Sequence, residues 1–339
     1  MKAAVFHKIG APLTIETVPD PAPAPSDLVV KVKCCGICGS DLHATCTPPG
    51  LPKGTVMGHE FSGEVVEVGK EAQNRWRVGD RVTALPYIGC GTCEACLSGD
   101  GMRCARMKAT GLGQIPGAYA EFVRVGSNET LKLPDAVSFQ EGATVEPLSV
   151  GLHAIHKSGL RSGESVLIIG AGPIGLSCAL WAKFLGARDV VVSERAPGRL
   201  SLAEKFGATA GIDASKESVG GAFHKIAGKG PDVIFECVGV PGLIQQCIAL
   251  APPRGRITVV GVCMQPDTIF PVLGIIKEIS LHFVVGYRKS DFQFTLDMLA
   301  ARRISSVPMI TDTVGLSAFP EAFEALKKPQ QQCKVMLEP

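Results

Sequence analysis

Ser165-Val-Leu-Ile-Ile-Gly170-Ala-Gly172-Pro-Ile-Gly175 decides the fold of this chain of 339 residues. An apolar run leads directly into the pattern G-x-G-x-x-G, and residues 176–185 suit a helix. Gly170 permits a tight turn, Gly172 lets the backbone approach a pyrophosphate, and Gly175 allows the helix to pack closely on the strand. The free N–H groups at the start of that helix attract phosphate. Because the motif lies between a strand and a helix, it predicts a dinucleotide-binding unit and not a chance glycine-rich turn.

The acid that ends the next apolar strand bears on the choice of coenzyme. Asp189-Val-Val-Val-Ser-Glu194 places a carboxylate where it can accept hydrogen bonds from an adenosine ribose and repel a 2′-phosphate. Arg195, the next residue, could instead bind the extra phosphate of NADP. Because repulsion from a neighbouring carboxylate is hard to offset, the sequence favours NAD over NADP. The expected coenzyme site also includes Pro173, Ile174 and Arg199.

The pattern of apolar and turn-forming residues differs on the two sides of this region. Downstream, apolar strands alternate with helical patterns, which indicates a parallel sheet covered on both faces; the strands are expected at 189–193, 232–237, 256–260 and 279–285. Upstream, short β-branched strands are broken by glycine and proline, which indicates a barrel-like β domain; examples are 28–33, 63–68 and 80–84.

After Gly286 the pattern indicates a helix, a short strand and a helix, and residues 333–337 are expected to form a strand that rejoins the first domain. The sequence therefore predicts an α/β protein of two domains. A β-rich domain covers 1–147 together with 287–339, and a doubly wound parallel-sheet domain covers 148–286.

Residues 89–104 contain cysteines in the spacing C-x2-C-x2-C-x7-C. Cys90, Cys93, Cys96 and Cys104 can surround one tetrahedral Zn²⁺ with four thiolates at about 2.3 Å. Such a site is closed and therefore structural. A disulfide cluster or unpaired thiols are the alternatives, and the spacing with its interspersed glycines favours zinc.

Composition points to a globular enzyme in a reducing compartment. Hydrophobic residues make up 46% and charged residues 19% of the chain, and the formal net charge is +2, which gives no reason to expect nucleic acid or a membrane surface as a partner. No run approaches the 18 apolar residues of a membrane span, and residues 1–8 lack a signal-peptide core. A cytoplasmic location is expected. Cysteines without a ligand-like pattern are expected to pack in the core: Cys34, Cys35, Cys46, Cys178, Cys237, Cys247, Cys263 and Cys333.

A second, more dispersed set of metal ligands precedes the cysteine stretch. Cys38 and His59 are too far apart for a local finger but suit two neighbouring loops. A catalytic zinc uses three protein ligands and keeps a fourth position open. Glu60 and Glu146 are the candidates for the third ligand, and a glutamate beside a ligating histidine can also orient it.

The combination of Cys38, Gly58-His59-Glu60, the four cysteines and the glycine motif resembles the zinc-dependent medium-chain alcohol dehydrogenases. Glu146, in Glu-Pro-Leu-Ser, resembles the sorbitol, threonine and butanediol dehydrogenase branch, in which Glu60 can also take a place on the metal. The resemblance covers essentially the whole chain. It implies a GroES-like catalytic domain with a Rossmann coenzyme domain, two zinc ions per chain, and a homodimer or homotetramer.

The same resemblance implies a route for the proton. Ser40, two residues from Cys38, can take the proton of a zinc-bound alcohol, and His43 matches the position that passes it to solvent through the nicotinamide ribose. Asp41 matches a position that orients the ligating histidine. Lys334 resembles a basic residue facing the coenzyme pyrophosphate; a solvated surface lysine is the alternative. Gly39 departs from the animal alcohol dehydrogenases, which have an arginine there.

These features predict hydride transfer between NAD(P) and a secondary alcohol, diol or polyol. Two alternatives are a zinc-independent quinone or enoyl reductase, which the metal ligands oppose, and a non-catalytic dinucleotide-binding zinc protein. The particular substrate is not predicted, because pocket loops diverge fastest. The uncharged residues 45–51 favour a modestly polar or alicyclic alcohol, whereas Arg288 resembles an arginine near the substrate of polyol dehydrogenases.

Overall fold

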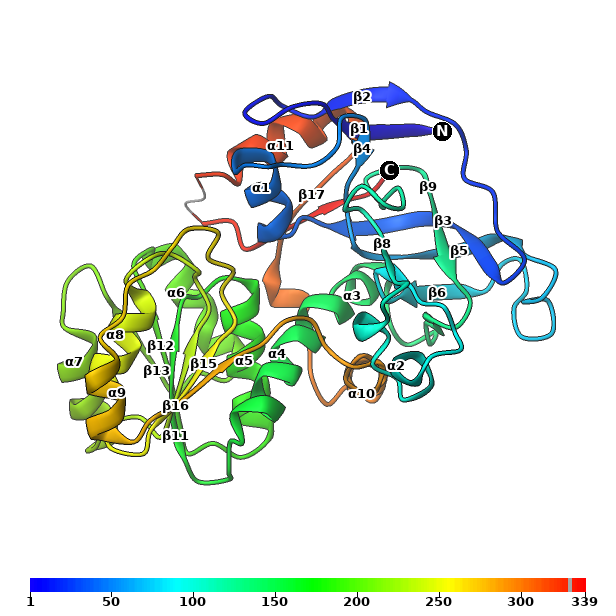
Figure 1. The fold of residues 1–339 in the computed structure, drawn as a ribbon. Helices are drawn as coiled ribbons and strands as arrows, with labels where there is room; N and C mark the ends of the chain where they lie inside the picture. The colour runs from blue at the N-terminus through cyan, green and yellow to red at the C-terminus, as the bar shows by residue number, and fades with distance from the viewer. Residues whose placement is uncertain (329–330) are drawn as a thin grey trace. The chain divides into compact units, whose positions relative to one another are not determined.

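The protein is described by a computed structural model that covers residues 1–328 and 331–339 (Figure 1). This part of the chain divides into two compact units. The first comprises Met1–Glu146 and Tyr287–Pro339, and the second comprises Pro147–Gly286. The expected α/β architecture, with a β-rich part and a parallel-sheet part, is confirmed.

The second unit is built on a six-stranded parallel sheet. Its order is β13 (Ala210–Asp213), β12 (Asp189–Glu194), β11 (Ser165–Ile169), β14 (Val233–Glu236), β15 (Arg256–Val259) and β16 (Ser280–Phe283). The central strand β11 is buried along its whole length, because helices cover both faces of the sheet. The edge strand β13 was not expected from the sequence, since Ala-Gly-Ile-Asp contains one large apolar side chain.

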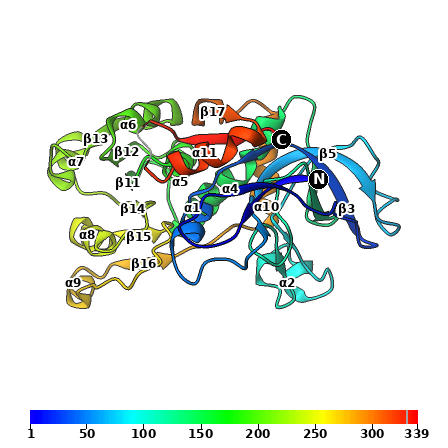
Figure 2. The ribbon, with the colours of Figure 1, turned by 90° about the horizontal axis from the view of Figure 1, so that it is seen from above.

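Helices lie on both faces of this sheet. Figure 2 shows α7 (Val219–Ala227), α8 (Leu243–Leu250) and α9 (Pro271–Lys277) on one side, and α4 (Val145–Ser158) and α5 (Pro173–Phe184) on the other. The helix α6 (Pro197–Ala203) packs against β12 and β13. On the first side, Phe223 of α7 and Ile248 of α8 pack on Leu167 and Ile234 of the sheet to form one apolar core.

The turn between β11 and α5 requires its glycines. Gly170 has a φ of +102°, a conformation that side chains rarely adopt. A Cβ at Gly175 would lie 1.8 Å from the carbonyl oxygen of Gly170, so only glycine lets the helix approach the strand this closely. The helix begins at Pro173, whose fixed φ suits the first turn.

The first unit contains a seven-stranded sheet. Its order is β10 (Thr130–Lys132), β6 (Arg81–Ala84), β5 (Glu60–Val68), β3 (Asp27–Gly36), β18 (Lys334–Leu337) and β17 (Ile310–Val314), with β9 (Phe122–Gly126) also pairing with β3. Smaller sheets are formed by β2 (Thr14–Thr17), β1 (Lys2–Phe6) and β4 (Thr55–Val56), and by β7 (Tyr87–Ile88) with β8 (Lys108–Ala109). The helices are α1 (Gly39–Cys46), α2 (Glu94–Leu97), α3 (Phe139–Ala143), α10 (Lys289–Ala300) and α11 (Phe319–Ala325).

The chain's last strand lies inside this sheet, between β3 and the edge strand β17. β18 pairs antiparallel with β3, with Met336 opposite Gly36 and Leu337 opposite Cys35, and it pairs parallel with β17. Residues 334–337 are completely or nearly completely buried. This pairing brings Lys334 next to the end of β3, where the chain enters the predicted metal site.

Most of the cysteines expected in the core are buried or partly buried, with one exception. Cys46 is exposed, because it is the last residue of α1 and faces away from the core. The expectation that Cys46 packs in the core is therefore wrong. Within residues 1–328 and 331–339, no helix has the length and apolar character needed to cross a membrane.

Candidate active site

Four cysteines of the first unit converge in one compact loop, which we call the cysteine lobe (residues 89–104). Cys93 is the N-cap of α2 and Cys96 lies within this helix, while Cys90 precedes it and Cys104 follows a 3-10 turn. Their Sγ atoms all lie within 4.8 Å of one another. The Cys93–Cys96 and Cys90–Cys96 separations are 3.6 and 3.9 Å. Thiolates on one tetrahedral zinc would be about 3.8 Å apart, so the lobe fits this ion.

The surroundings of the lobe act in opposite directions on its thiols: burial raises the pKa of Cys96 to about 12, whereas backbone hydrogen bonds lower the pKa values of Cys90 and Cys104. Backbone N–H groups of Thr92 and Cys93 lower the pKa of Cys90 to about 5. The backbone N–H of Arg106 donates to the Sγ of Cys104 at 3.4 Å. All cysteines of the chain are free, so these sulfurs are not joined as disulfides. Hydrogen-bonded thiolates are the form of cysteine that binds a metal.

A second group consists of Cys38, His59 and Glu60, whose ligand atoms also lie within 4.8 Å of one another. Cys38 is the N-cap of α1, and Glu60 is the first residue of β5. His59 follows Gly58, which has a φ of +96°; a Cβ there would lie 2.5 Å from the ring of Tyr119. The structure thus brings three of the predicted catalytic ligands together, with Glu60 rather than Glu146 as the third.

Asp41 is placed to orient His59. Its Oδ1 lies 3.4 Å from the Nδ1 of His59, and its Oδ2 accepts a 2.5 Å hydrogen bond from the hydroxyl of Tyr119. Asp41 and Tyr119 are fully buried. Burial acts to lower the pKa of His59, but the charges of Asp41 and Cys38 outweigh it and raise that pKa well above its ordinary value. Tyr119 was not foreseen, because it lies 78 residues from Asp41 in the chain and belongs to no motif.

Glu60 and Lys334 form a buried ion pair. The Nζ of Lys334 donates to both carboxylate oxygens of Glu60, at 2.6 and 2.8 Å, and to the carbonyl oxygen of Ile37 at 2.9 Å. Each residue is 1% exposed. Gly36 makes room for the pair, since a Cβ there would lie 2.3 Å from Glu60 and 3.1 Å from Lys334. The alternative of a solvated Lys334 is therefore wrong, whereas its contact with a pyrophosphate stays a prediction.

Glu146 is the second carboxylate of this region. It is 8% exposed and lies outside the compact group of ligand atoms. Burial raises its pKa to about 7, Glu60 acts in the same direction, and His59 and Lys334 act against it. The hydroxyl of Tyr287 also acts on this carboxylate, although it makes no well-aligned hydrogen bond among the described residues. Tyr287 is 3% exposed.

The two predicted proton-relay residues lie on α1, directly after Cys38. The hydroxyl of Ser40 donates to the Sγ of Cys38 at 3.2 Å and is partly buried. His43 lies about one turn further along the helix and is exposed. Ser40 is thus at the metal ligand and His43 at the surface, as a path for a proton to water requires.

Three of the predicted coenzyme residues line a cavity of about 590 Å³ in the second unit, whereas Gly172, Pro173, Gly175 and Lys334 lie outside its lining. Gly170, Glu194 and Arg195 line it, together with Val240 and Leu243 on the other side. Arg199 lies in α6 and Ile174 in α5, outside the lining of this cavity. An apolar slot with a carboxylate at its rim suits an adenosine moiety.

Glu194 also has a structural role that the sequence did not indicate. Its Oε2 accepts from the backbone N–H of Ala171 at 2.9 Å, within the glycine motif. Its Oε1 accepts from the backbone N–H groups of Arg195 at 2.6 Å and Ala196 at 3.0 Å. Glu194 therefore links the glycine-rich turn to the turn after β12, and these three hydrogen bonds leave about one of its four acceptor positions.

These features define a zinc-type, nicotinamide-dependent dehydrogenase, and comparison with known proteins agrees. The profile of the alcohol dehydrogenase GroES-like domain matches residues 24–135, and that of the zinc-binding dehydrogenase domain matches residues 173–301. The chain is 35% identical to (R,R)-butanediol dehydrogenase of Bacillus subtilis over 353 residues, covering 100% of both proteins. It is 32% identical to sorbitol dehydrogenase of the same organism over 346 residues, covering 100% of this chain and 97% of that protein.

Structural comparison gives the same result. A zinc-binding dehydrogenase of Sinorhizobium meliloti 1021, whose crystal structure contains NADP, superposes with a TM-score of 0.87 at 32% identity, covering 100% of this chain and 99% of the other. The chain belongs to the zinc-dependent medium-chain alcohol dehydrogenase family. It is an NAD(P)-dependent oxidoreductase of alcohols or polyols, which sets aside the alternatives of a zinc-independent reductase and a non-catalytic protein.

Proposed function

We propose that this enzyme interconverts a secondary alcohol, diol or polyol and its ketone with NAD, using two zinc ions per chain. The observation that carries the proposal is the group formed by Cys38, His59 and Glu60, with Ser40 hydrogen-bonded to Cys38. A screen of polyols, vicinal diols, cyclic alcohols and their ketones, followed by NADH absorbance, tests it. Absence of turnover across this screen would contradict the proposal.

The two metals have different roles. In the cysteine lobe four thiolates would close the coordination sphere, so this zinc is structural. The other ion would be held by Cys38, His59 and a carboxylate, which leaves a position for substrate. Glu60 is within reach, and Glu146 lies nearby as the alternative. The orphaned Nδ1 of His59 and Oδ1 of Asp41 support this assignment, because metal binding through the other ring nitrogen would align these two atoms.

The chemistry follows from the residues around this second site. When bound, zinc lowers the pKa of a coordinated alcohol and nicotinamide accepts the hydride. Asp41, held by Tyr119, fixes the ring of His59. Ser40 takes the proton of the alcohol, and the exposed His43 passes it to solvent.

Two features of the sequence favour different kinds of substrate. Arg288 is exposed beside Tyr287 and could donate to the hydroxyl groups of a polyol. The stretch 45–51 carries no charge, which suits a less polar alcohol. We favour a vicinal diol or short polyol, because an exposed arginine and an uncharged stretch together suit a substrate with few hydroxyl groups.

NAD is the proposed coenzyme, and replacing Glu194 tests this. Glu194→Ala should lower kcat/KM for NAD by about 10- to 100-fold, since a hydrogen bond to a charged group contributes about 1.5–3 kcal/mol. The kcat/KM for NADP should fall less than that for NAD. The variant no longer has a carboxylate that repels the 2′-phosphate, and Arg195 can bind this phosphate. The measurement is the ratio of kcat/KM for the two coenzymes.

Glu217 offers a matched control for this experiment. It also lines the cavity but is exposed, and among the described residues its carboxylate accepts no hydrogen bond from the glycine-rich turn, so Glu217→Ala should leave the ratio nearly unchanged. A thermal melt of each variant detects any loosening caused by loss of the Glu194–Ala171 hydrogen bond. A wild-type enzyme that already prefers NADP would show that Arg195, and not Glu194, controls the choice.

The expected oligomer has a candidate interface in the second unit. Among the described residues β16 pairs only with β15, so one edge of the sheet is open. Large apolar side chains nearby are between 56 and 74% exposed: Phe270, Val272, Ile275, Ile276, Phe283 and Val285. A second copy of the chain can cover this surface and extend the sheet.

Charge placed on this surface should separate the subunits. Ile276→Glu, at a position 72% exposed, is expected to shift the protein from dimer or tetramer toward monomer in size-exclusion chromatography with light scattering. Val78→Glu, at a position 68% exposed in the first unit, is the control and should leave the mass unchanged. A monomeric wild-type protein would refute the oligomer, and an unchanged Ile276→Glu variant would refute this interface.

A further inference from the structure

We propose that Lys289 is a positioning residue for the alcohol site: it fastens the segment that carries Tyr287 and Arg288 to the cysteine lobe. The inference deepens the proposed function and rests on it. According to this inference, the cysteine lobe not only binds a structural zinc but also holds Tyr287 beside the carboxylate of Glu146.

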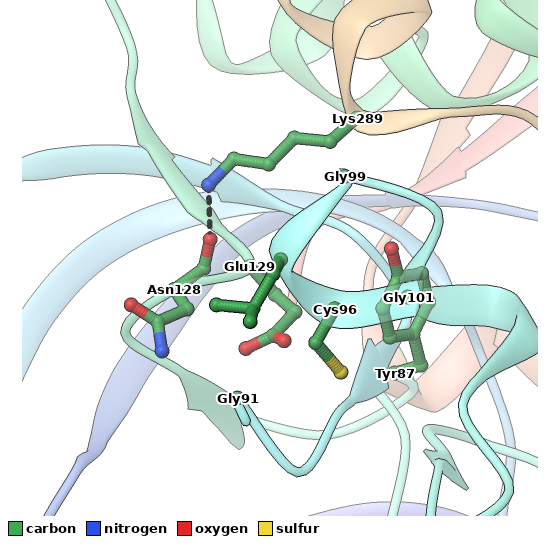
Figure 3. Close-up of a pocket in the computed structure, with 9 residues that line it drawn as sticks. Tyr87, Gly91, Cys96, Gly99, Gly101, Asn128, Glu129 and Lys289 are labelled. Carbon is green, nitrogen blue, oxygen red and sulfur yellow. Dashed lines mark hydrogen bonds between the residues drawn. The ribbon is translucent and has the colours of Figure 1, made fainter. Parts of the chain in front are cut away.

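Two contacts made by Lys289 carry the first step. Its backbone N–H donates to the carbonyl oxygen of Gly99, inside the lobe, at 3.0 Å. Its Nζ donates to the carbonyl oxygen of Asn128, as Figure 3 shows. Lys289 is the first residue of α10, so its N–H is one of the groups that the helix itself leaves without a partner. The lobe supplies that partner.

The lobe is in turn fixed to the body of the unit around a cavity of about 220 Å³. The buried carboxylate of Glu129, 8% exposed, accepts from the backbone N–H of Gly89 at 3.2 Å. The ring of Tyr87 packs on Gly101, where a Cβ would lie 2.7 Å from it. Figure 3 shows Glu129, Tyr87 and Lys289 arranged around the side chain of Cys96. The lobe is therefore a fixed support and not a loose loop.

The other end of the segment reaches the active site. Tyr287 stacks on Phe292 of α10, with ring centroids 5.5 Å apart and an interplanar angle of 23°. The backbone N–H of Arg288 donates to Asp291 at 3.0 Å, which fixes the start of the helix. The hydroxyl of Tyr287 is buried and has no hydrogen-bond partner among the described residues, and it is one of the groups that offset the rise that burial causes in the pKa of Glu146. Any shift of the first turn of α10 therefore moves Tyr287 relative to Glu146.

Two substitutions at one position separate the contacts. Lys289→Pro removes the N–H and the ammonium group, yet proline fits the first position of a helix. Arg288, with φ −86° and ψ 157°, already has a conformation suited to the residue before proline. Lys289→Ala removes the ammonium group and keeps the N–H. Tyr287→Phe removes only the hydroxyl that faces Glu146.

The experiment measures KM and kcat for the alcohol turned over fastest in the substrate screen. It also measures the rate at which zinc passes from the protein to the chelator 4-(2-pyridylazo)resorcinol. Lys289→Pro should raise KM by about 10-fold, the effect of roughly 1.4 kcal/mol, with kcat per bound zinc changed less than about twofold, and should speed the release of one zinc. Lys289→Ala should have a smaller effect than Lys289→Pro on KM and on the rate of zinc release. Tyr287→Phe should raise KM without changing zinc release.

Distinct results would overturn the inference. If Lys289→Pro lowers kcat with KM unchanged, the contact only stabilises the fold, and if KM and zinc release both match the wild type, the contact is without consequence. Absence of turnover in the wild type would contradict the proposed function. The zinc-release comparison needs no turnover, so it still tests the attachment of Lys289 to the lobe.

Discussion

Replacing Cys38 by serine is expected to remove one of the two zinc ions and to abolish alcohol oxidation. Cys38, His59 and Glu60 would supply one ligand atom each in the proposed site, so loss of the thiolate would leave too few strong ligands to hold the ion. Replacing a residue that only hydrogen-bonds to a metal ligand typically lowers metal affinity or activity by about 10–100-fold. Loss of a ligand should therefore lower kcat/KM by more than about 100-fold. The zinc content measured by elemental analysis should fall from two ions per chain to one, and the melting temperature should change little.

Cys96→Ser is the matched substitution in the other metal group. A structural zinc contributes directly to the free energy of folding, so this variant should lose one zinc and also lose thermal stability or assembly. Its activity should fall as folded protein is lost. A wild-type protein with one zinc or none would refute the two-site proposal. A Cys38→Ser variant that keeps two zinc ions would show that the catalytic ion is held elsewhere.

The features foreseen from the sequence are local. The spacing of Cys90, Cys93, Cys96 and Cys104 determines a compact loop, and a strand that runs into G-x-G-x-x-G determines a turn. These patterns work because a few neighbouring residues specify the geometry almost alone. Cys38 and His59 were predicted as ligands of one metal despite their separation in the chain, because each lies in a motif typical of the family.

The features that were missed arise from pairs brought together by the fold. Glu60 and Lys334 are 274 residues apart, and their contact follows from the pairing of β18 with β3. Tyr119 reaches Asp41 in the same way. A lysine in a short strand, or a tyrosine in a bend, gives no sign of its partner, because the contact depends on how distant segments pack and not on residue type. The exposed Cys46 shows the converse, since a cysteine outside any motif was assumed to be buried.

The edge strand β13 was missed for a related reason. Its residues, Ala210–Asp213, have little intrinsic preference for a strand, and pairing with β12 holds them in place. The structural role of Glu194 was missed. Its contact with a ribose stays a prediction, whereas its hydrogen bond to Ala171 depends on how two turns meet and could not be predicted from the sequence.

Loss of the Ser40 hydroxyl should have the second large effect. Ser40→Ala removes the group that takes the proton from the alcohol, so kcat for oxidation should fall by roughly 10²–10⁴-fold, the range of a full acid–base group. Two zinc ions should remain, because Ser40 contacts Cys38 through its hydroxyl but is not itself a ligand. Ser40→Thr keeps a hydroxyl on the same atom and is the control, expected to retain most of the activity.

His43→Ala should have a smaller effect that depends on pH. His43 is exposed, so water or buffer can partly replace it, and a loss on the order of 10-fold is expected near neutral pH. Hydroxide takes the proton more readily as the pH rises, so the gap between the variant and the wild type should narrow at high pH. The test is kcat as a function of pH for both enzymes, with zinc measured on the same samples. If Ser40→Ala keeps two zinc ions and an undiminished rate of oxidation, the proton leaves the alcohol by a route that does not use Ser40.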